Sequence, residues 1–182
     1  MSERRFRNPA ERIDPRSRSS DVVLPAQVRQ QLTQFVETVR SVPDEQIHGR
    51  GVTALFHGPS GAGKTRAALA IARELDRQVW RIDLSKVISK YIGETEKQIN
   101  AVFQDAMESG VVLLLDEADA LFGKRTQVRE SNDRYANIEV SYLLQRIETY
   151  EGVMILTTNA PQNLDEAFVR RLRCIIEFQP PT

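Results

Sequence analysis

The chain has 182 residues, 41% of them hydrophobic, so it can bury one core and is expected to form one α/β domain. Its 25 Lys and Arg residues balance 25 Asp and Glu residues, which leaves no global field favouring nucleic acid or an anionic membrane. The single Cys174 excludes an internal disulfide and favours a reducing cytoplasm. No apolar stretch approaches the roughly 20 residues that span a bilayer.

Basic residues gather at the amino end, where positions 1–20 hold six Arg residues against three acids. We predict a disordered basic lead-in over residues 1–20, and a docking arm is the alternative use of the same charge. Residues 25–40 then predict a leading helix, because apolar residues recur at helical spacing behind Pro25.

Short apolar runs recur along the rest of the chain, separated by helical patterns. The expected strands cover residues 52–57, 79–82, 111–115, 153–157 and 174–178. The expected helices cover residues 64–75, 94–109, roughly 136–150 and 165–172. This alternation predicts a parallel sheet with helices on both faces. Between Gly123 and Arg134 the chain is polar without an apolar period, so we predict a mobile loop there.

The loop after the first expected strand has a phosphate-binding pattern. It reads Gly58-Pro59-Ser60-Gly61-Ala62-Gly63-Lys64-Thr65 and fits G-x-x-x-x-G-K-[ST]. Glycines let successive N–H groups converge on phosphate oxygens, and the start of the next helix favours an anion. Lys64 would reach the β- and γ-phosphates, and the Thr65 hydroxyl would bind magnesium. A chance glycine-rich turn is the alternative, but spacing and strand-turn-helix context favour a nucleoside triphosphate.

Polar side chains end two of the other expected strands. Asp116 and Glu117 follow the third strand, and Asn159 follows the fourth. Since ligands of an open parallel sheet bind at the carboxyl ends of strands, these residues should lie beside the phosphate loop. Asp116 is placed to hold magnesium, directly or through water, and Glu117 to polarise an attacking water. Helix capping by the two acids, and turn formation by Asn159, are the alternatives.

The order of these segments resembles that of the AAA+ ATPases over about residues 20–180. In that family they are Walker A, Walker B and sensor 1, so the resemblance implies those roles for Lys64, Thr65, Asp116, Glu117 and Asn159. It implies ATP and Mg²⁺ as cofactors and a P-loop NTPase three-layer sandwich. Its sheet has five parallel strands in the order 5-1-4-3-2, counted from the amino end. Residues 21–182 are thereby expected to form the large α/β domain of an AAA+ ATPase.

The segment from Asp165 to Arg173 resembles the family's stretch whose arginines act on the nucleotide of a neighbouring subunit. Matching from Asp165 puts these arginine fingers at Arg170 and Arg173. Assembly of the chain with itself as a ring, a hexamer in the complete protein, is thereby implied. Arg171 and Leu172 stand where many members carry Pro and Gly, so the dominant finger stays open. A basic surface helix is the alternative.

The tripeptide Tyr91-Ile92-Gly93 resembles the family's first pore loop, with which AAA+ rings grip an extended polypeptide. It implies a protein substrate, so neither nucleic acid nor a membrane is expected as a partner. Covering of the helix at 94–109 by the Tyr-Ile pair is the alternative. Residues 81–85, 89–97 and 133–140 resemble more narrowly a bacterial branch of AAA proteins, some of which accompany phage-tail-like contractile injection particles.

The function implied is coupling of Mg-ATP hydrolysis at subunit interfaces to remodelling or unfolding of protein substrates. A nucleic-acid motor or clamp-loading ATPase, and a non-hydrolysing nucleotide-dependent assembly module, are the alternatives. Family members continue past the fifth strand into a helical lid, whereas nothing follows Thr182, so the chain is expected to be a fragment or to receive its lid from a partner. The sequence identifies neither the client protein nor the adenine contacts.

Overall fold

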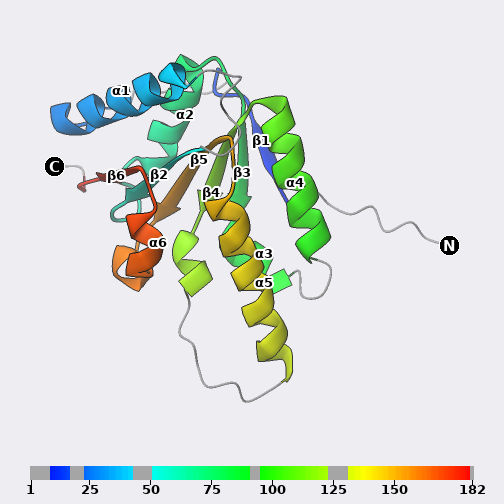
Figure 1. The fold of residues 1–182 in the computed structure, drawn as a ribbon. Coiled ribbons are helices and arrows are strands. Elements are labelled where there is room, and N and C mark those ends of the chain that lie inside the picture. The colour runs from blue at the N-terminus through cyan, green and yellow to red at the C-terminus, as the bar shows by residue number, and fades with distance from the viewer. Residues whose placement is uncertain (1–8, 17–22, 43–50, 91–94, 123–130, 181–182) are drawn as a thin grey trace.

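A six-stranded sheet forms the centre of the computed structural model, which describes residues 9–16, 23–42, 51–90, 95–122 and 131–180 (Figure 1). Its strands, in sheet order, are β1 (Glu11–Ile13), β3 (Val79–Asp83), β4 (Val112–Asp116), β5 (Val153–Thr158), β2 (Val52–His57) and β6 (Cys174–Glu177). The strands β2 to β6 are parallel to one another, and β1 is antiparallel to β3. The central strands are apolar runs because both of their faces are buried.

The five parallel strands follow the predicted order, but the prediction of a purely parallel five-stranded sheet is wrong. β1 adds a sixth strand at the β3 edge, with Ile13 opposite Val79. The prediction of a disordered lead-in over residues 1–20 is therefore wrong for Glu11–Ile13. Two contacts explain why residues 11–13 are ordered. Ile13 is buried, at 5% exposed, and the Arg12 guanidinium carbon lies 4.8 Å from the centre of the Trp80 ring. The short strand also shields an edge of the sheet.

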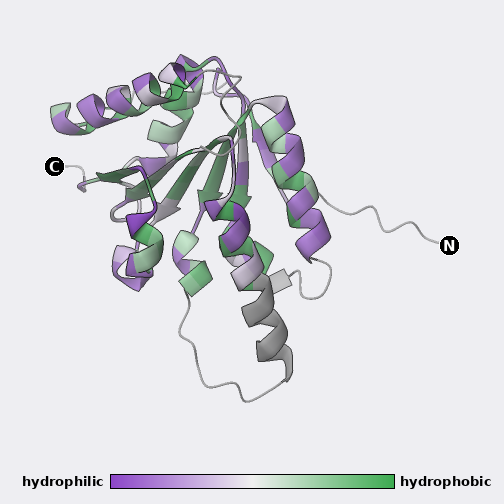
Figure 2. Ribbon diagram, viewed as in Figure 1, coloured by the Kyte–Doolittle hydropathy of each residue, from purple (hydrophilic) through white to green (hydrophobic). Residues whose placement is uncertain are grey.

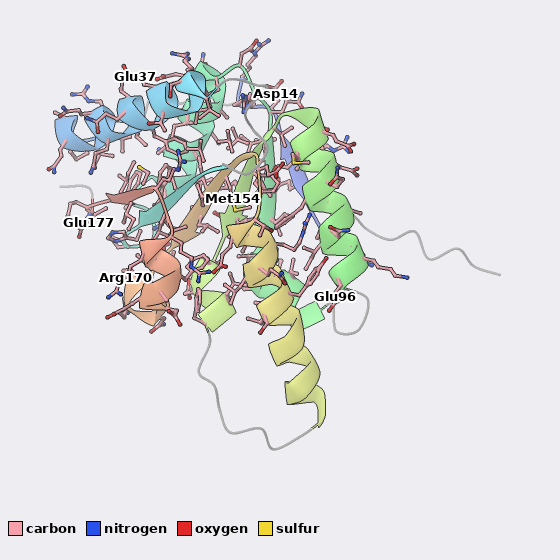
Figure 3. All side chains as sticks on the ribbon, viewed as in Figure 1. Asp14, Glu37, Glu96, Met154, Arg170 and Glu177 are labelled. Atoms are coloured by element: carbon pink, nitrogen blue, oxygen red, sulfur yellow. The ribbon has the colours of Figure 1, made fainter. Side chains whose placement is uncertain are left out.

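Helices cover both faces of the sheet and make three layers (Figure 1). α1 (Ala26–Ser41) and α2 (Lys64–Glu74) pack on one face. α3 (Leu84–Lys90), α4 (Thr95–Ser109) and α5 (Ser131–Glu148) pack on the other. Figure 2 shows the consequence, with apolar strands in the middle and polar residues on the outer sides of the helices. Met154, which has no exposed surface, marks the centre of the sheet (Figure 3).

Two helices differ from the sequence-based expectations. α5 begins at Ser131, so residues 131–134 are helical and the predicted mobile loop is wrong for them. A helix extends beyond its apolar stripe because each added residue gains a backbone hydrogen bond once the helix has formed. Residues 123–130 lie outside the described part of the chain. α3 was not predicted; it buries Leu84 and Val87, and the Asp83 side chain accepts a hydrogen bond from the Ser85 amide at 3.0 Å.

Three short elements complete the fold. The 3₁₀ helix η2 (Ala118–Phe122) follows β4, and η3 (Pro161–Asn163) follows β5. α6 (Glu166–Arg170) starts at Asp165, whose side chain accepts a hydrogen bond from the Ala167 amide at 2.7 Å. Within the described ranges, no helix has the length and apolar character to cross a membrane.

Candidate nucleotide site

The loop between β2 and α2 has a backbone geometry that requires glycine. Gly58, Gly61 and Gly63 have φ angles of +150°, +80° and +98°. A Cβ on Gly58 would collide with the carbonyl oxygen of Phe178, whereas one on Gly61 would meet nothing within 4 Å. Gly63 is the N-cap of α2, and no described side chain caps this helix. The first amides of α2 are therefore available to an anion such as phosphate.

Lys64 is the charged group of this loop and is only 8% exposed. Its Nζ donates hydrogen bonds to the carbonyl oxygens of Gly58 and Pro59, at 2.7 and 2.8 Å, and to Oδ1 of Asn159 at 2.7 Å. Burial lowers the pKa of Lys64, while the nearby Glu117 and Asp116 act in the opposite direction. The fold thus brings together the predicted phosphate-binding lysine and the predicted Asn159 from segments far apart in the sequence.

Asp116 ends β4 and is 5% exposed. Its Oδ1 accepts a hydrogen bond from the Thr157 hydroxyl at 2.7 Å, and its Oδ2 forms an ion pair with Nε of Arg81. No role was predicted from the sequence for Arg81 or Thr157. A signal was present, since Arg81 is a charged residue inside an apolar strand, and such a group needs a partner when it is partly buried.

Glu117 follows Asp116 in the left-handed region of backbone space, at φ +62°. This conformation is uncommon for residues other than glycine and turns the chain from β4 into η2. Burial raises the pKa of Glu117. The negative charges of Asp119, Asp83 and Asp116 raise this pKa further, and the positive charge of Lys64 lowers it. A raised pKa brings a carboxylate closer to the range in which it exchanges protons at neutral pH.

The arginines after Asp165 have different surroundings. Arg170 is exposed and lies 3.7 Å from Glu166, one helical turn away; Figure 3 shows it on the outer side of α6. Arg171 forms an ion pair with Glu148 of α5. Arg173 is exposed. All three arginines are thus exposed, with Arg170 paired to Glu166 and Arg171 paired to Glu148.

The predicted pore loop, Tyr91-Ile92-Gly93, lies outside the described residues. α3, which leads into it, contacts η2, the 3₁₀ helix after Glu117. The segment before this tripeptide is thereby packed against the segment that follows the acidic end of β4.

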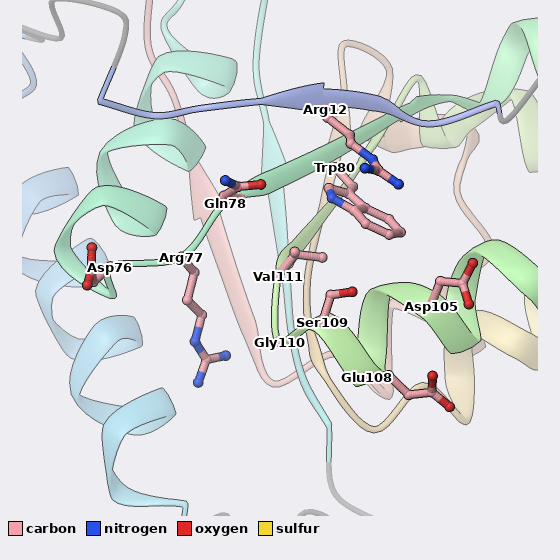
Figure 4. A pocket seen from close by; sticks show the side chains of 10 residues that line it. All are labelled: Arg12, Asp76, Arg77, Gln78, Trp80, Asp105, Glu108, Ser109, Gly110 and Val111. Carbon is pink, nitrogen blue, oxygen red and sulfur yellow. The ribbon is translucent and has the colours of Figure 1, made fainter.

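A cavity of about 470 Å³ lies at the opposite end of the sheet, where β3 and β4 begin (Figure 4). Its lining includes Arg12 and Trp80 on the strand side and Asp105 and Glu108 on α4. Ligands of open α/β sheets bind at the carboxyl ends of the strands, where the phosphate loop and Asp116 lie. This cavity is therefore separate from the candidate nucleotide site.

The residues at the carboxyl ends of the strands fit a magnesium nucleotide. The loop offers backbone amides and Lys64 for phosphate, and Thr65 and Asp116 offer oxygen atoms for magnesium. No group of three or more His, Cys, Asp or Glu residues suited to a metal occurs among the residues that the structure describes. The two oxygen donors Thr65 and Asp116 suit Mg²⁺, which commonly uses one or two protein ligands together with phosphate oxygens and water.

Fold and site together define a P-loop NTPase domain. Residues 54–181 match the family described as "ATPase family associated with various cellular activities (AAA)". This match covers well over half of the chain, and the chain belongs to the AAA ATPase family.

Curated relatives agree with this assignment. The chain is 35% identical over 175 residues to an "Uncharacterized AAA family ATPase y4kL" of Sinorhizobium fredii, covering 94% of this chain and 52% of that protein. It is 36% identical over 134 residues to the "Proteasome-activating nucleotidase" of Methanococcus vannielii, covering 70% of this chain and 33% of the relative. The chain therefore spans about half the length, or less, of these relatives.

Solved structures show the same fold. The crystal structure of the FIGL-1 AAA domain in complex with ADP has a TM-score of 0.69 and 26% identity, and covers 90% of this chain and 56% of that one. Another crystal structure of the FIGL-1 AAA domain has a TM-score of 0.71 at 24% identity, covering 93% of this chain and 57% of that one.

Proposed function

We propose that this chain binds Mg-ATP between the phosphate loop and the carboxyl ends of β4 and β5, and hydrolyses it. The observation that carries the proposal is the contact between Lys64 and Asn159 beside the buried Asp116. A cation, a carboxylate and an amide converge there next to helix amides that no described side chain caps. Membership of the AAA ATPase family supports ATP use in general.

Each residue has a defined role in this proposal. Lys64 neutralises the β- and γ-phosphates, and Thr65 and Asp116 hold magnesium, which supplies charge neutralisation at the phosphoryl group. Glu117 takes a proton from the attacking water. Asn159, whose Oδ1 already accepts from Lys64, orients the γ-phosphate or the water through its amide N–H₂.

We infer that Arg170 and Arg173 act on the nucleotide of a neighbouring copy in a ring, a hexamer in the complete protein. Their exposure supports this inference, as does their match to the family's arginine positions counted from Asp165. A guanidinium supplied in trans accelerates phosphoryl transfer by roughly 10³- to 10⁵-fold in related systems. Hydrolysis by a monomer is accordingly expected to be slow.

We further infer that ATP turnover remodels or unfolds protein substrates through Tyr91-Ile92-Gly93. The printed name of the Methanococcus relative, a proteasome-activating nucleotidase, supports a protein-directed activity. The packing of α3 on η2 supports a mechanical connection between this loop and the nucleotide site. A cytoplasmic location is inferred from the single cysteine, Cys174. The finer resemblance to a bacterial branch found with contractile injection particles stays a prediction.

Steady-state ATP hydrolysis measured against protein concentration tests the proposal. Turnover per chain should rise with concentration, because each site needs an arginine from a neighbour. Glu117→Gln should abolish turnover while ATP still binds, and Arg170→Ala should lower turnover by roughly 100-fold or more. Arg171→Ala is the matched control and should retain turnover within about threefold. Concentration-independent turnover that Arg170→Ala leaves unchanged would contradict the trans mechanism.

A further inference from the structure

We propose that Arg81 is a positioning residue for magnesium: together with Thr157 it fixes the Asp116 carboxylate in the orientation that binds the ion. The proposal rests on the proposed function, in which Asp116 holds magnesium. Arg81 itself touches neither nucleotide nor metal in this account and acts through Asp116.

The geometry places Asp116 between two partners on neighbouring strands. In the β3–β4 ladder Arg81 stands opposite Leu114, so its side chain lies on the same face as Asp116, two residues further along β4. Arg81 holds Oδ2 of Asp116 from β3, and Thr157 donates to Oδ1 from β5, on the other side of β4. Rotation of the carboxylate would break both interactions, so each oxygen has a fixed position.

The hydrogen-bonding capacity of the carboxylate leaves room for a ligand. An ionised carboxylate has about four lone-pair sites on its two oxygens, and Arg81 and Thr157 use one on each. The remaining sites are free to accept magnesium or a magnesium-bound water. Partners of this kind orient metal ligands, and their loss typically lowers metal affinity by about 10- to 100-fold.

Charge also favours this role. The Asp116 side chain is 7% exposed and that of Arg81 is 36% exposed, so the cation lies at the boundary between the buried acid and solvent. Burial of a carboxylate without a partner is unfavourable, and a guanidinium supplies both charge and directed N–H groups. An ion pair that merely joined β3 to β4 would be redundant with the ladder that already pairs Val79–Asp83 with Val112–Asp116.

The test compares binding of a fluorescent, non-hydrolysable ATP analogue in Mg²⁺ and in EDTA. The variants are Arg81→Gln, Arg81→Lys and Thr157→Val, with Arg29→Gln on the exposed side of α1 as the control for loss of one charge. We expect Arg81→Gln to bind within about twofold of wild type in EDTA but to lose about 10- to 100-fold of the enhancement by Mg²⁺. Arg81→Lys should recover part of it, because lysine restores the charge but not the planar geometry.

Thr157→Val removes the other contact without removing a charge and should also lower the Mg²⁺ enhancement. It keeps the proposal testable if Arg81→Gln fails to fold. The proposal is overturned if the wild type shows the enhancement and these variants retain it, or if they lose affinity equally in Mg²⁺ and EDTA. A wild-type protein without any Mg²⁺ enhancement would overturn the proposed magnesium site and this proposal together.

Discussion

The ammonium of Lys64 donates a 2.7 Å hydrogen bond to Oδ1 of Asn159, joining the phosphate loop to the end of β5 across 95 positions of sequence. The bond is charge-assisted and the lysine is 8% exposed, so both side chains have defined positions. The three N–H groups of the ammonium are all used, on Gly58, Pro59 and Asn159, so a phosphate that replaces one of these partners would also lie near the amide of Asn159.

Asn159→Ala should separate catalysis from binding. Lys64 keeps its two carbonyl partners, so the affinity for ATP should change by less than about threefold. Turnover should fall by about 10- to 100-fold, because a directed contact to the phosphate or water is lost. Single-turnover hydrolysis and equilibrium binding measure the two effects. Asn163→Ala, an exposed residue of η3, is the control, and equal turnover in both variants would remove Asn159 from the mechanism.

Two substitutions at Glu117 can test whether the left-handed backbone after β4 is strained. Glu117→Gly and Glu117→Ala both remove the carboxylate, but only glycine adopts φ +62° without cost. The glycine variant should have a free energy of unfolding about 1 kcal/mol higher than that of the alanine variant. At Asn100, an exposed residue inside α4, the same pair should show the reverse order, by about 1 kcal/mol. Urea unfolding measures both pairs, and a more stable Glu117→Ala would refute the strain.

The buried phenol of Tyr150 should make the free energy of unfolding depend on pH. Burial raises the pKa of Tyr150, and Arg77 acts in the opposite direction. The stabilising effect of the neutral phenol is complete below the unfolded-state pKa of about 10 and is lost as pH rises above it. The free energy of unfolding should thus fall with pH in that range, by about 1.4 kcal/mol per pH unit from this group.

Tyr150→Phe should remove the part of the fall in the free energy of unfolding at alkaline pH that comes from this phenol. Among the described residues no hydrogen-bond partner reaches the Tyr150 hydroxyl, so the variant should also be about 1 kcal/mol more stable at pH 7. Tyr142→Phe, at a half-buried position of α5, is the control. Urea unfolding at pH 7 and above pH 10 measures both effects; a less stable Tyr150→Phe at pH 7 would show that the hydroxyl has a partner.

The packing of β1 on the sheet edge can be tested at Ile13. Ile13→Ala should lower the free energy of unfolding by about 2 kcal/mol, because a buried side chain is lost. Val23, which is 98% exposed, is the control, and Val23→Ala should change stability by less than about 0.5 kcal/mol. An Ile13→Ala variant as stable as wild type would mean that β1 does not pack on the sheet in solution.

The sequence predicted the features that depend on local patterns. The glycine conformations of the phosphate loop, the buried strands and the amphipathic helices follow from residue type and spacing. β1 was missed because a three-residue strand among arginines has no period of its own and is ordered by its contacts with Trp80 and β3. α3 was missed because seven residues are too few for a clear helical pattern.

The sequence predicted the site residues that lie in a recognisable motif of one segment. It did not predict the contacts that form between two segments. Lys64 begins α2, Asp116 ends β4 and Asn159 directly follows β5, so topology alone brings them to one edge of the sheet. The contacts of Asp116 with Arg81 and Thr157 depend on strand register, and the ion pair of Arg171 joins the residue after α6 to Glu148 of α5. Neither relationship has a signature within a single segment.

Titration calorimetry of ATP with Mg²⁺ into the wild type and Lys64→Ala tests the central claim most directly, with circular dichroism to establish that the variant folds. We predict one site per chain in the wild type and binding at least about 10- to 100-fold weaker in Lys64→Ala, because charge-assisted hydrogen bonds worth about 1.5–3 kcal/mol are lost. Equal affinity in the two proteins, or no binding by the wild type, would contradict the account.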